Sequence, residues 1–139
     1  MIKQTINQVL INTNGQSLVN ITDQINLWIK ENNCIRGILN LYIMHTSASL
    51  IIQENADPSV LEDLISFYEK IVPMKNDYKH YSEGPDDMPA HIKSSLTNSS
   101  LTLSIIKNTL TVGVWQGIYL FEHRHKPNTR KINLHYIGE

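Results

Sequence analysis

Residues 101–137 read LTLSIIKNTLTVGVWQGIYLFEHRHKPNTRKINLHYI, and strand patterns follow one another through this stretch. Every second residue from Leu101 to Ile105 is apolar, which is typical of a strand with one buried face. A long apolar strand is expected over residues 112–124, and alternation returns over residues 130–137. Consecutive strands at the end of a chain that carries its helices earlier favour an α+β fold with a mostly antiparallel sheet.

The first hundred residues mix strands with helices. Asn20 stands three residues before Asp23, which resembles a helix capping arrangement, and Asp57-Pro58 is a second helix start. A short third helix is predicted because Met88, Ile92 and Leu96 recur every four residues. The remaining expected elements are strands over 2–11, 35–44 and 50–52, helices ending near 33 and 73, and a loop over 74–89.

The composition excludes several classes of protein. The 139 residues are 41% hydrophobic and 18% charged, with a formal net charge of −1, and they predict a single domain over residues 1–139. A disordered chain would combine fewer apolar residues with a higher net charge, and a dedicated DNA- or RNA-binding protein would carry a basic excess. No apolar run is long enough to span a membrane. With no apolar signal segment and a single cysteine, Cys34, the sequence indicates a cytoplasmic protein.

Polar residues that could carry chemistry gather at four places, all at predicted strand ends, in the long loop or on the short helix. A loop of about fifteen residues inside a compact domain is often functional. The four groups are His45-Thr46-Ser47 with Glu54-Asn55 and Asp57; Tyr78, His80, Asp86 and Asp87; His91 and Lys93; and Trp115-Gln116, Glu122-His123-Arg124 and Arg130.

Three of these groups could hold a divalent metal. His45, His80 and His91 could together bind a catalytic zinc and leave one position open for water or substrate. Their spacing matches no recognised zinc signature, and local hydrogen bonding of each histidine is the alternative interpretation. Asp86-Asp87 could hold Mg²⁺ beside a phosphate-bearing substrate, or could simply cap the following helix.

The last group suits an anionic or ring-bearing ligand. By strand alternation Gln116 and Glu122 lie on one face. Arg124 and Arg130 suit phosphate oxygens, with a solvated basic loop as the alternative. Trp115 could contact a ring, or could belong to a core or an interface. A serine nucleophile near His45 is rejected because the chain has no Gly-x-Ser-x-Gly elbow.

Taken together, these motifs resemble the YjbQ-like family, also called the secondary thiamine-phosphate synthase family. The resemblance covers essentially the whole chain, and several separated motifs occur in the right order. They are His45-Thr46-Ser47-Ala48-Ser49, Glu54-Asn55-Ala56-Asp57-Pro58, His80, the run from Gly84 to Lys93, Gly113-Val114-Trp115-Gln116-Gly117-Ile118, Glu122-His123-Arg124 and Arg130. One departure is Val114, where the family commonly has a threonine, so a hydroxyl contact would be lost.

The resemblance implies an α+β homotrimer with a pocket near the subunit interface. It implies weak thiamine-phosphate synthase activity, in which the thiazole-phosphate nitrogen attacks hydroxymethylpyrimidine diphosphate and diphosphate leaves. We therefore expect a small cytoplasmic enzyme that acts on a phosphorylated metabolite, with a divalent metal, Zn or Mg, as its cofactor. His45, His80 and His91 are expected to bind metal or substrate phosphate, and Glu122 to accept a proton or support another group. The expected substrate-binding residues are Thr46, Ser47, Asn55, Asp86, Asp87, Lys93, Trp115, Gln116, Arg124 and Arg130.

Two alternatives remain beside this expectation. The first is a metal-dependent hydrolase of a small phosphorylated metabolite, with a zinc-bound water as nucleophile. The second is a metabolite-binding module without catalysis. Neither nucleic acid nor a membrane is expected as a partner.

Overall fold

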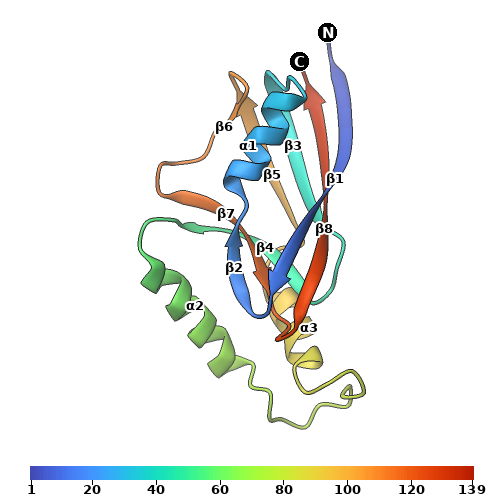
Figure 1. Ribbon diagram of the computed structural model, residues 1–139, viewed down its shortest axis with the longest axis vertical. Coiled ribbons are helices and arrows are strands. Elements are labelled where there is room, and N and C mark those ends of the chain that lie inside the picture. Colours follow the sequence, from blue (N-terminus) through green and yellow to red (C-terminus); the bar gives the residue numbers. More distant parts are fainter.

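The computed structural model describes residues 1–139, which form three helices and eight strands. Figure 1 shows both termini at one end of an elongated molecule, and α2, α3 and the loop that joins them at the other end. The elements are β1 (Lys3–Asn14), β2 (Ser17–Asn20), α1 (Thr22–Glu31), β3 (Arg36–Ile43), β4 (Ala48–Glu54), α2 (Pro58–Ile71), α3 (Asp87–Leu96), β5 (Ser100–Ile106), β6 (Thr109–Leu110), β7 (Gln116–Glu122) and β8 (Pro127–Gly138).

The strands form two antiparallel sheets. The larger sheet has the order β1-β8-β3-β5-β6, and the smaller has the order β2-β7-β4. The first and last strands of the chain pair along their whole length, from Lys3 opposite Gly138 to Asn14 opposite Pro127. The predicted α+β class, with antiparallel pairing and three helices, is confirmed.

The core lies between the larger sheet, α1 and the smaller sheet. Alternate residues of β3 and β8, such as Leu41 and Leu134, point inward and are fully buried. Ile25 and Ile29 of α1 and Ile118 of β7 complete the same apolar cluster. Each such side chain contributes about 1.5–3 kcal/mol on burial, so this cluster is the main source of stability.

Strand β7 is buried on both faces, which explains its continuous apolar sequence. Ile118 and Leu120 point into the core, whereas Phe121 lies on the other face, edge-on to Tyr68 of α2 at 5.5 Å between ring centroids. The strand begins at Gln116 and not at residue 112 as predicted. A turn precedes it, in which the Gln116 amide donates to the Gly113 carbonyl at 3.0 Å.

The observed helix starts agree in part with those predicted from the sequence. Asp57 caps α2 as predicted, because its Oδ1 accepts from the Ser59 amide at 3.0 Å. At α1 the side chain of Asn20 instead accepts from the amide of Thr22 at 3.0 Å, and the cap residue is Ile21. Two short strands, β2 and β6, lie where the sequence pattern predicts no separate strand.

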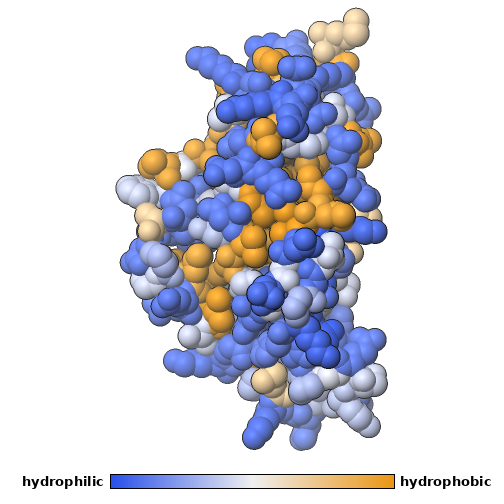
Figure 2. Space-filling model, in the orientation of Figure 1, coloured by the Kyte–Doolittle hydropathy of each residue, from blue (hydrophilic) through white to orange (hydrophobic).

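Apolar and hydrophilic surface residues occupy different parts of the molecule along its length. In Figure 2 apolar residues form a band across the middle of the visible face, while the end that carries α3 and its preceding loop is mostly hydrophilic. Helix α2 has no fully buried residue. None of the three helices has the length and apolar character needed to cross a membrane.

Candidate functional site

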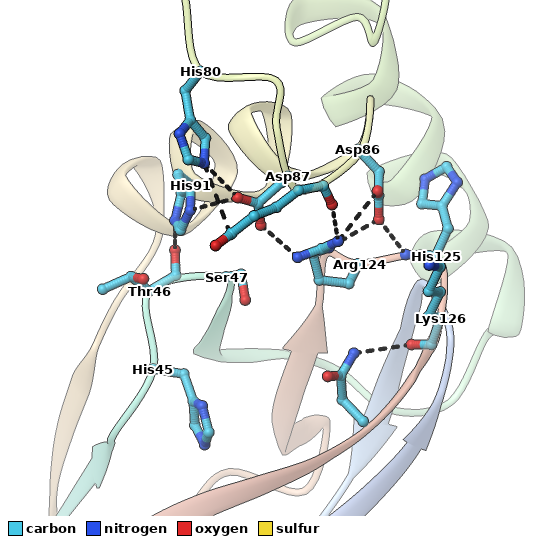
Figure 3. A network of polar contacts seen from close by, with 12 residues as sticks. His45, Thr46, Ser47, His80, Asp86, Asp87, His91, Arg124, His125 and Lys126 are labelled. Carbon is cyan, nitrogen blue, oxygen red and sulfur yellow. Dashed lines mark hydrogen bonds and ion pairs between the residues drawn. The ribbon is translucent and has the colours of Figure 1, made fainter.

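The candidate site lies at the end of the molecule opposite the termini, where three segments meet. These are the loop over residues 72–86, the first turns of α3, and the turn between β7 and β8 (Figure 3). Four charged side chains at this end, Asp87, Lys93, Glu122 and Arg130, are at most 4% exposed. Buried charges of this kind need partners, so their contacts define the site.

Helix α3 presents Asp87 and His91 on one face because they are four residues apart. Asp87 also lies in the first turn, where a carboxylate interacts favourably with the helix dipole. The preceding loop brings His80 over the same face, and His80 Nε2 lies 2.6 Å from Asp87 Oδ2. His91 Nε2 lies 3.1 Å from that same oxygen.

Glu83 completes a cluster of four potential metal ligands. The ligand atoms of His80, Glu83, Asp87 and His91 all lie within 4.8 Å of one another. Asp87 is buried, whereas the other three side chains are partly open to solvent. Two imidazole nitrogens with two carboxylates form a donor set that suits zinc or another transition metal better than Mg²⁺, which prefers oxygen ligands.

The protonation of His91 supports this interpretation. Its Nδ1 lies 2.8 Å from the carbonyl oxygen of Thr46, which can only accept, so Nδ1 carries a proton. In the neutral ring, Nε2 then directs a lone pair at the negatively charged carboxylate of Asp87, and the two repel each other. A cation between the two groups, or a second proton on the ring, removes this repulsion. A backbone carbonyl on the far nitrogen is also the usual outer support of a metal-binding histidine.

Arg124 joins the turn after β7 to the start of α3. It donates to Asp87 Oδ1 at 2.5 Å, to Asp86 Oδ2 at 3.0 Å and to the Glu83 carbonyl at 2.9 Å. Burial alone would raise the pKa of both aspartates. The amide of His125 and the guanidinium of Arg124 outweigh that effect at Asp86 and keep its pKa below the usual value. The pKa of Asp87 is also lowered, by its hydrogen bond with His80 and the charges nearby.

Asp86 is therefore not a side-chain helix cap, which corrects the alternative drawn from the sequence. It precedes α3, but its side chain makes no capping hydrogen bond. The carboxylate instead accepts from Arg124 and from the amide of His125, at 2.9 Å. The preference of this carboxylate for a fixed guanidinium explains why the capping pattern is misleading here.

Glu122 is fully buried beneath the site and has all of its acceptors occupied. Thr13 donates to its Oε1 at 2.5 Å, and Arg130 Nε donates to the same oxygen at 2.8 Å. Arg130 Nη2 and the amide of Arg124 bind the other oxygen. Of the two predicted roles, proton acceptor and supporting partner, this geometry favours the second, because Glu122 orients Arg130.

His45 lies apart from the four-ligand cluster, and Figure 3 shows it on the other side of Thr46 from His91. Its Nε2 accepts from the backbone amide of Lys131 at 2.8 Å. Burial, followed by the positive charges of Arg130 and Lys131, lowers its pKa despite the opposing charge of Glu122. The structure thus brings together His80 and His91, but not His45, as candidate metal ligands.

An open cleft of about 480 Å³ connects His45 with His91. The cleft lies between the end of β3, the turn that joins β3 to β4, one side of α3 and the segment that joins α3 to β5. Its lining is almost entirely polar and comprises Tyr42, His45, Thr46, His91, Ser94, Ser95, Thr97 and Ser99. Thr46 belongs to this lining, while Ser47 contributes its carbonyl to Arg130 Nη2 at 3.2 Å.

Lys93 and His123 form the buried side of the site. Lys93 is paired with Glu69 of α2, so its amine is engaged rather than free for a substrate. His123, which no predicted role includes, is fully buried, and its Nε2 lies 2.9 Å from Ser49 Oγ. Its Nδ1 has no hydrogen-bond partner. Burial lowers the pKa of His123 to about 3, with the charges of Lys93 and Arg130 as further causes.

Three predicted binding residues lie far from this site. Asn55, Trp115 and Gln116 gather at the opposite end of the smaller sheet, where Asn55 Nδ2 donates to the Gln116 carbonyl at 3.3 Å. The pairing of β4 with β7 runs from Ala48–Glu122 to Glu54–Gln116. Six residues of strand separate the two ends by about 20 Å. Trp115 is 63% exposed.

Sequence reasoning did not assign roles to Glu83, Thr13 or Glu69. Glu83 is three residues after His80 in the same loop, which is a signal for a shared ligand set. Thr13 and Glu69 reach the site only through the pairing of β1 with β8 and the packing of α2. Nothing in their local sequence distinguishes them.

Comparison with known proteins gives consistent matches along the chain. The model of a family described as "UPF0047 protein YjbQ-like" matches residues 7–139. The UPF0047 protein sll1880 of Synechocystis is 45% identical over 132 residues, which cover 94% of this chain and 90% of that protein. A YjbQ/UPF0047-family protein of Clostridium acetobutylicum has a solved structure that is 35% identical, with a TM-score of 0.84, over 92% of this chain and 97% of that one. A YbjQ-like protein of Sulfolobus solfataricus P2, at 22% identity and a TM-score of 0.91, covers both chains completely and shares the fold.

Proposed function

This chain belongs to the YjbQ-like UPF0047 family, and from that premise we propose that it is a metal-dependent enzyme acting on a small phosphorylated metabolite. The observation that carries the proposal is the convergence of His80 Nε2 and His91 Nε2 on the buried carboxylate of Asp87. This convergence lies beside an open polar cleft that His91 also lines. A binding site for a reactive cation next to a substrate-sized space is the usual arrangement of a metalloenzyme.

His80, Asp87 and His91, with Glu83, would hold the metal. Once bound, the ion would supply a Lewis acid for a phosphoryl oxygen and could lower the pKa of a coordinated water. Arg124 holds Asp87 in place through its other oxygen, at 2.5 Å, and Thr46 fixes the ring of His91. The remaining member of the predicted histidine trio, His45, is assigned to the substrate side of the cleft.

The first reaction to test is the joining of thiazole phosphate to hydroxymethylpyrimidine diphosphate, with weak activity. The cationic groups near the cleft support this assignment, because a departing diphosphate needs positive charge to stabilise it. The family resemblance of the motifs is the reason to choose this pair of substrates.

Hydrolysis of a small phosphorylated metabolite is the second candidate, and the donor set favours it. Two imidazoles in the cluster suit zinc, which activates water efficiently near neutral pH, whereas diphosphate chemistry commonly uses Mg²⁺ on oxygen ligands. A protein that binds a metabolite saturably and releases it unchanged would instead be a binding module.

We further propose that the active form is a homotrimer. The outer face of the larger sheet carries Ile6, Leu10, Ile38, Tyr42 and Ile137, each about half exposed. An apolar face of this kind is typical of an interface. A trimer would also give a role to the exposed Trp115 at the far end of the smaller sheet, as a residue that reaches the cleft of a neighbouring subunit.

The decisive experiment combines metal analysis with activity assays on the purified protein. We expect about one transition-metal ion per chain, and loss of both metal and turnover in His80→Ala and His91→Ala. His125→Ala is the matched control, because this exposed imidazole is nearby but contacts Asp86 only through its backbone amide. Retained metal and turnover in both cluster variants would overturn the proposal.

A further inference from the structure

We propose that His45 and Arg130 form a separate subsite for an anionic oxygen, such as one on a phosphate group, at the end of the cleft away from the metal cluster. This inference deepens the proposed function, on which it rests for the presence of a phosphorylated substrate. The argument begins with the tautomer of His45. The backbone amide of Lys131 can only donate, so the Nε2 atom that it reaches at 2.8 Å must be unprotonated.

The proton of the neutral His45 ring therefore lies on Nδ1. Arg130 Nη1 is 3.4 Å from this Nδ1. Because a guanidinium has no acceptor and Nδ1 carries a hydrogen, the two nitrogens cannot bond to each other. Two donors thus lie side by side, and neither has an acceptor within the protein.

The burial of Arg130 makes it unfavourable for its Nη1 donor to remain without an acceptor. It is only 4% exposed. Its Nε and Nη2 are occupied by Glu122 and by the Ser47 carbonyl, which fixes the guanidinium in place. The Nη1 group alone remains, and a buried donor without an acceptor costs about 1–3 kcal/mol. An incoming oxyanion would satisfy Nη1 and His45 Nδ1 at the same time.

Three hydroxyl groups that line the cleft have already used their donors. The hydroxyl of Ser94 donates to the Ala48 carbonyl at 3.1 Å, and that of Ser95 to the Ile92 carbonyl at 2.7 Å. Thr97 is likewise bonded to the Lys93 carbonyl at 2.9 Å. Lys131 is exposed and makes no ion pair, so it adds an uncompensated positive charge beside His45. The charge of Arg130 itself is largely balanced by Glu122.

The subsite is open to a ligand because His45 lines the cleft. Figure 3 shows that the ring of His45 points away from His80 and His91. A bound anion at this position would therefore contact the protein without touching the metal cluster. The two ends of the cleft would hold different parts of one substrate, the anionic group at His45 and the reacting centre at the metal.

The test uses inorganic phosphate and metal-free protein, so that it is independent of the metal proposal. Nitrogen-15 NMR of the wild-type protein is expected to show the Nδ1–H tautomer for His45. Titration with phosphate, at constant ionic strength with sodium chloride, should shift the Nδ1 signal saturably. The same titration of His80→Ala should give the same affinity, because the metal cluster takes no part.

Two substitutions of His45 separate its two nitrogens. His45→Asn keeps an amide donor near the Nδ1 position, whereas His45→Gln places its amide near Nε2 and provides no donor at Nδ1. We expect phosphate affinity to fall about tenfold or more in His45→Gln, as for the loss of one charge-assisted hydrogen bond, and to be partly restored in His45→Asn. Thermal unfolding of each variant checks that it is folded.

Three results would overturn the proposal of an anion subsite at His45 and Arg130. They are an Nε2–H tautomer of His45, the absence of saturable phosphate binding to the wild-type protein, and unchanged affinity in folded His45→Gln. Failure of the metal proposal would appear differently, as a protein without bound metal that still binds phosphate through His45.

Discussion

At the scale of single residues, the site is built by pairing each buried charge with a specific partner. Arg130 is held by Glu122, and Arg124 by Asp86 and Asp87. Removing one member of such a pair costs more than the pair itself contributes, because the remaining charge stays buried. His123 is different, because it is buried without charge and one of its nitrogens has no partner.

His123 should make stability depend on pH. Its pKa is about 3 in the folded protein against an ordinary value of 6.5, so the unfolded chain binds the extra proton between these values. The free energy of unfolding should therefore fall as the pH is lowered through this window, by at most about 1.4 kcal/mol per unit. Urea unfolding between pH 7 and pH 4.5 measures the slope. His123→Gln should flatten it and His125→Gln should not; equal slopes in all three proteins would contradict the assignment.

Glu122→Gln should destabilise the protein strongly. The substitution keeps the size of the side chain but leaves the guanidinium of Arg130 buried without its counter-ion. We expect a loss of about 3–5 kcal/mol in the free energy of unfolding, measured by urea titration at pH 7. Glu62→Gln is the control, because Glu62 is exposed on α2 and makes no ion pair. A loss below 1 kcal/mol would mean that this pair is not a principal support of the site.

At the scale of elements, the sequence predicts most of the helices and long strands, because their periodicity is local. The start of α2 at Asp57-Pro58 and the alternation of β8 are examples. The short strands β2 and β6 escape prediction because four and two residues carry too little periodicity. The same limit applies to the site. The sequence groups His80 and His91 as metal ligands, but it includes His45 with them and assigns Asp87 to Mg²⁺ or to a helix cap. The separation of His45 and of Trp115 depends on strand register, which no local pattern encodes.

Strand register also leaves two paired positions, Gly37 and Gly138, where only glycine fits. A Cβ on Gly37 of β3 would lie 2.3 Å from the carbonyl oxygen of Ile137 and 2.7 Å from the Cα of Gly138. Both atoms belong to the backbone of β8, so Gly37→Ala should separate these strands and lower the unfolding temperature markedly. Gly113→Ala is the matched control, since the added Cβ meets only the flexible side chain of Gln116 at 3.3 Å. Equal unfolding temperatures for the two variants would contradict this account.

At the scale of the whole molecule, assembly and the site can be tested together. We expect light scattering after gel filtration to give three times the chain mass of 15.9 kDa. Ile38→Lys, on the outer face of the larger sheet, should yield a smaller species. Ile71→Lys, on α2, should not, although the two isoleucines are exposed to a similar extent, 49% and 50%. A trimer that survives Ile38→Lys would place the interface elsewhere.

The absence of any fully buried residue in α2 has a consequence for motion. The helix is attached mainly through Tyr68 against Phe121 and through the ion pair of Glu69 with Lys93. It can therefore detach while both sheets stay intact, and its amide hydrogens should exchange with deuterated solvent well before those of β7. Each such opening would release the amine of Lys93 from its carboxylate. The side chain of Lys93, which is structural in the closed protein, would then be free for a short time to contact an anion beside the site, at a frequency set by the stability of α2.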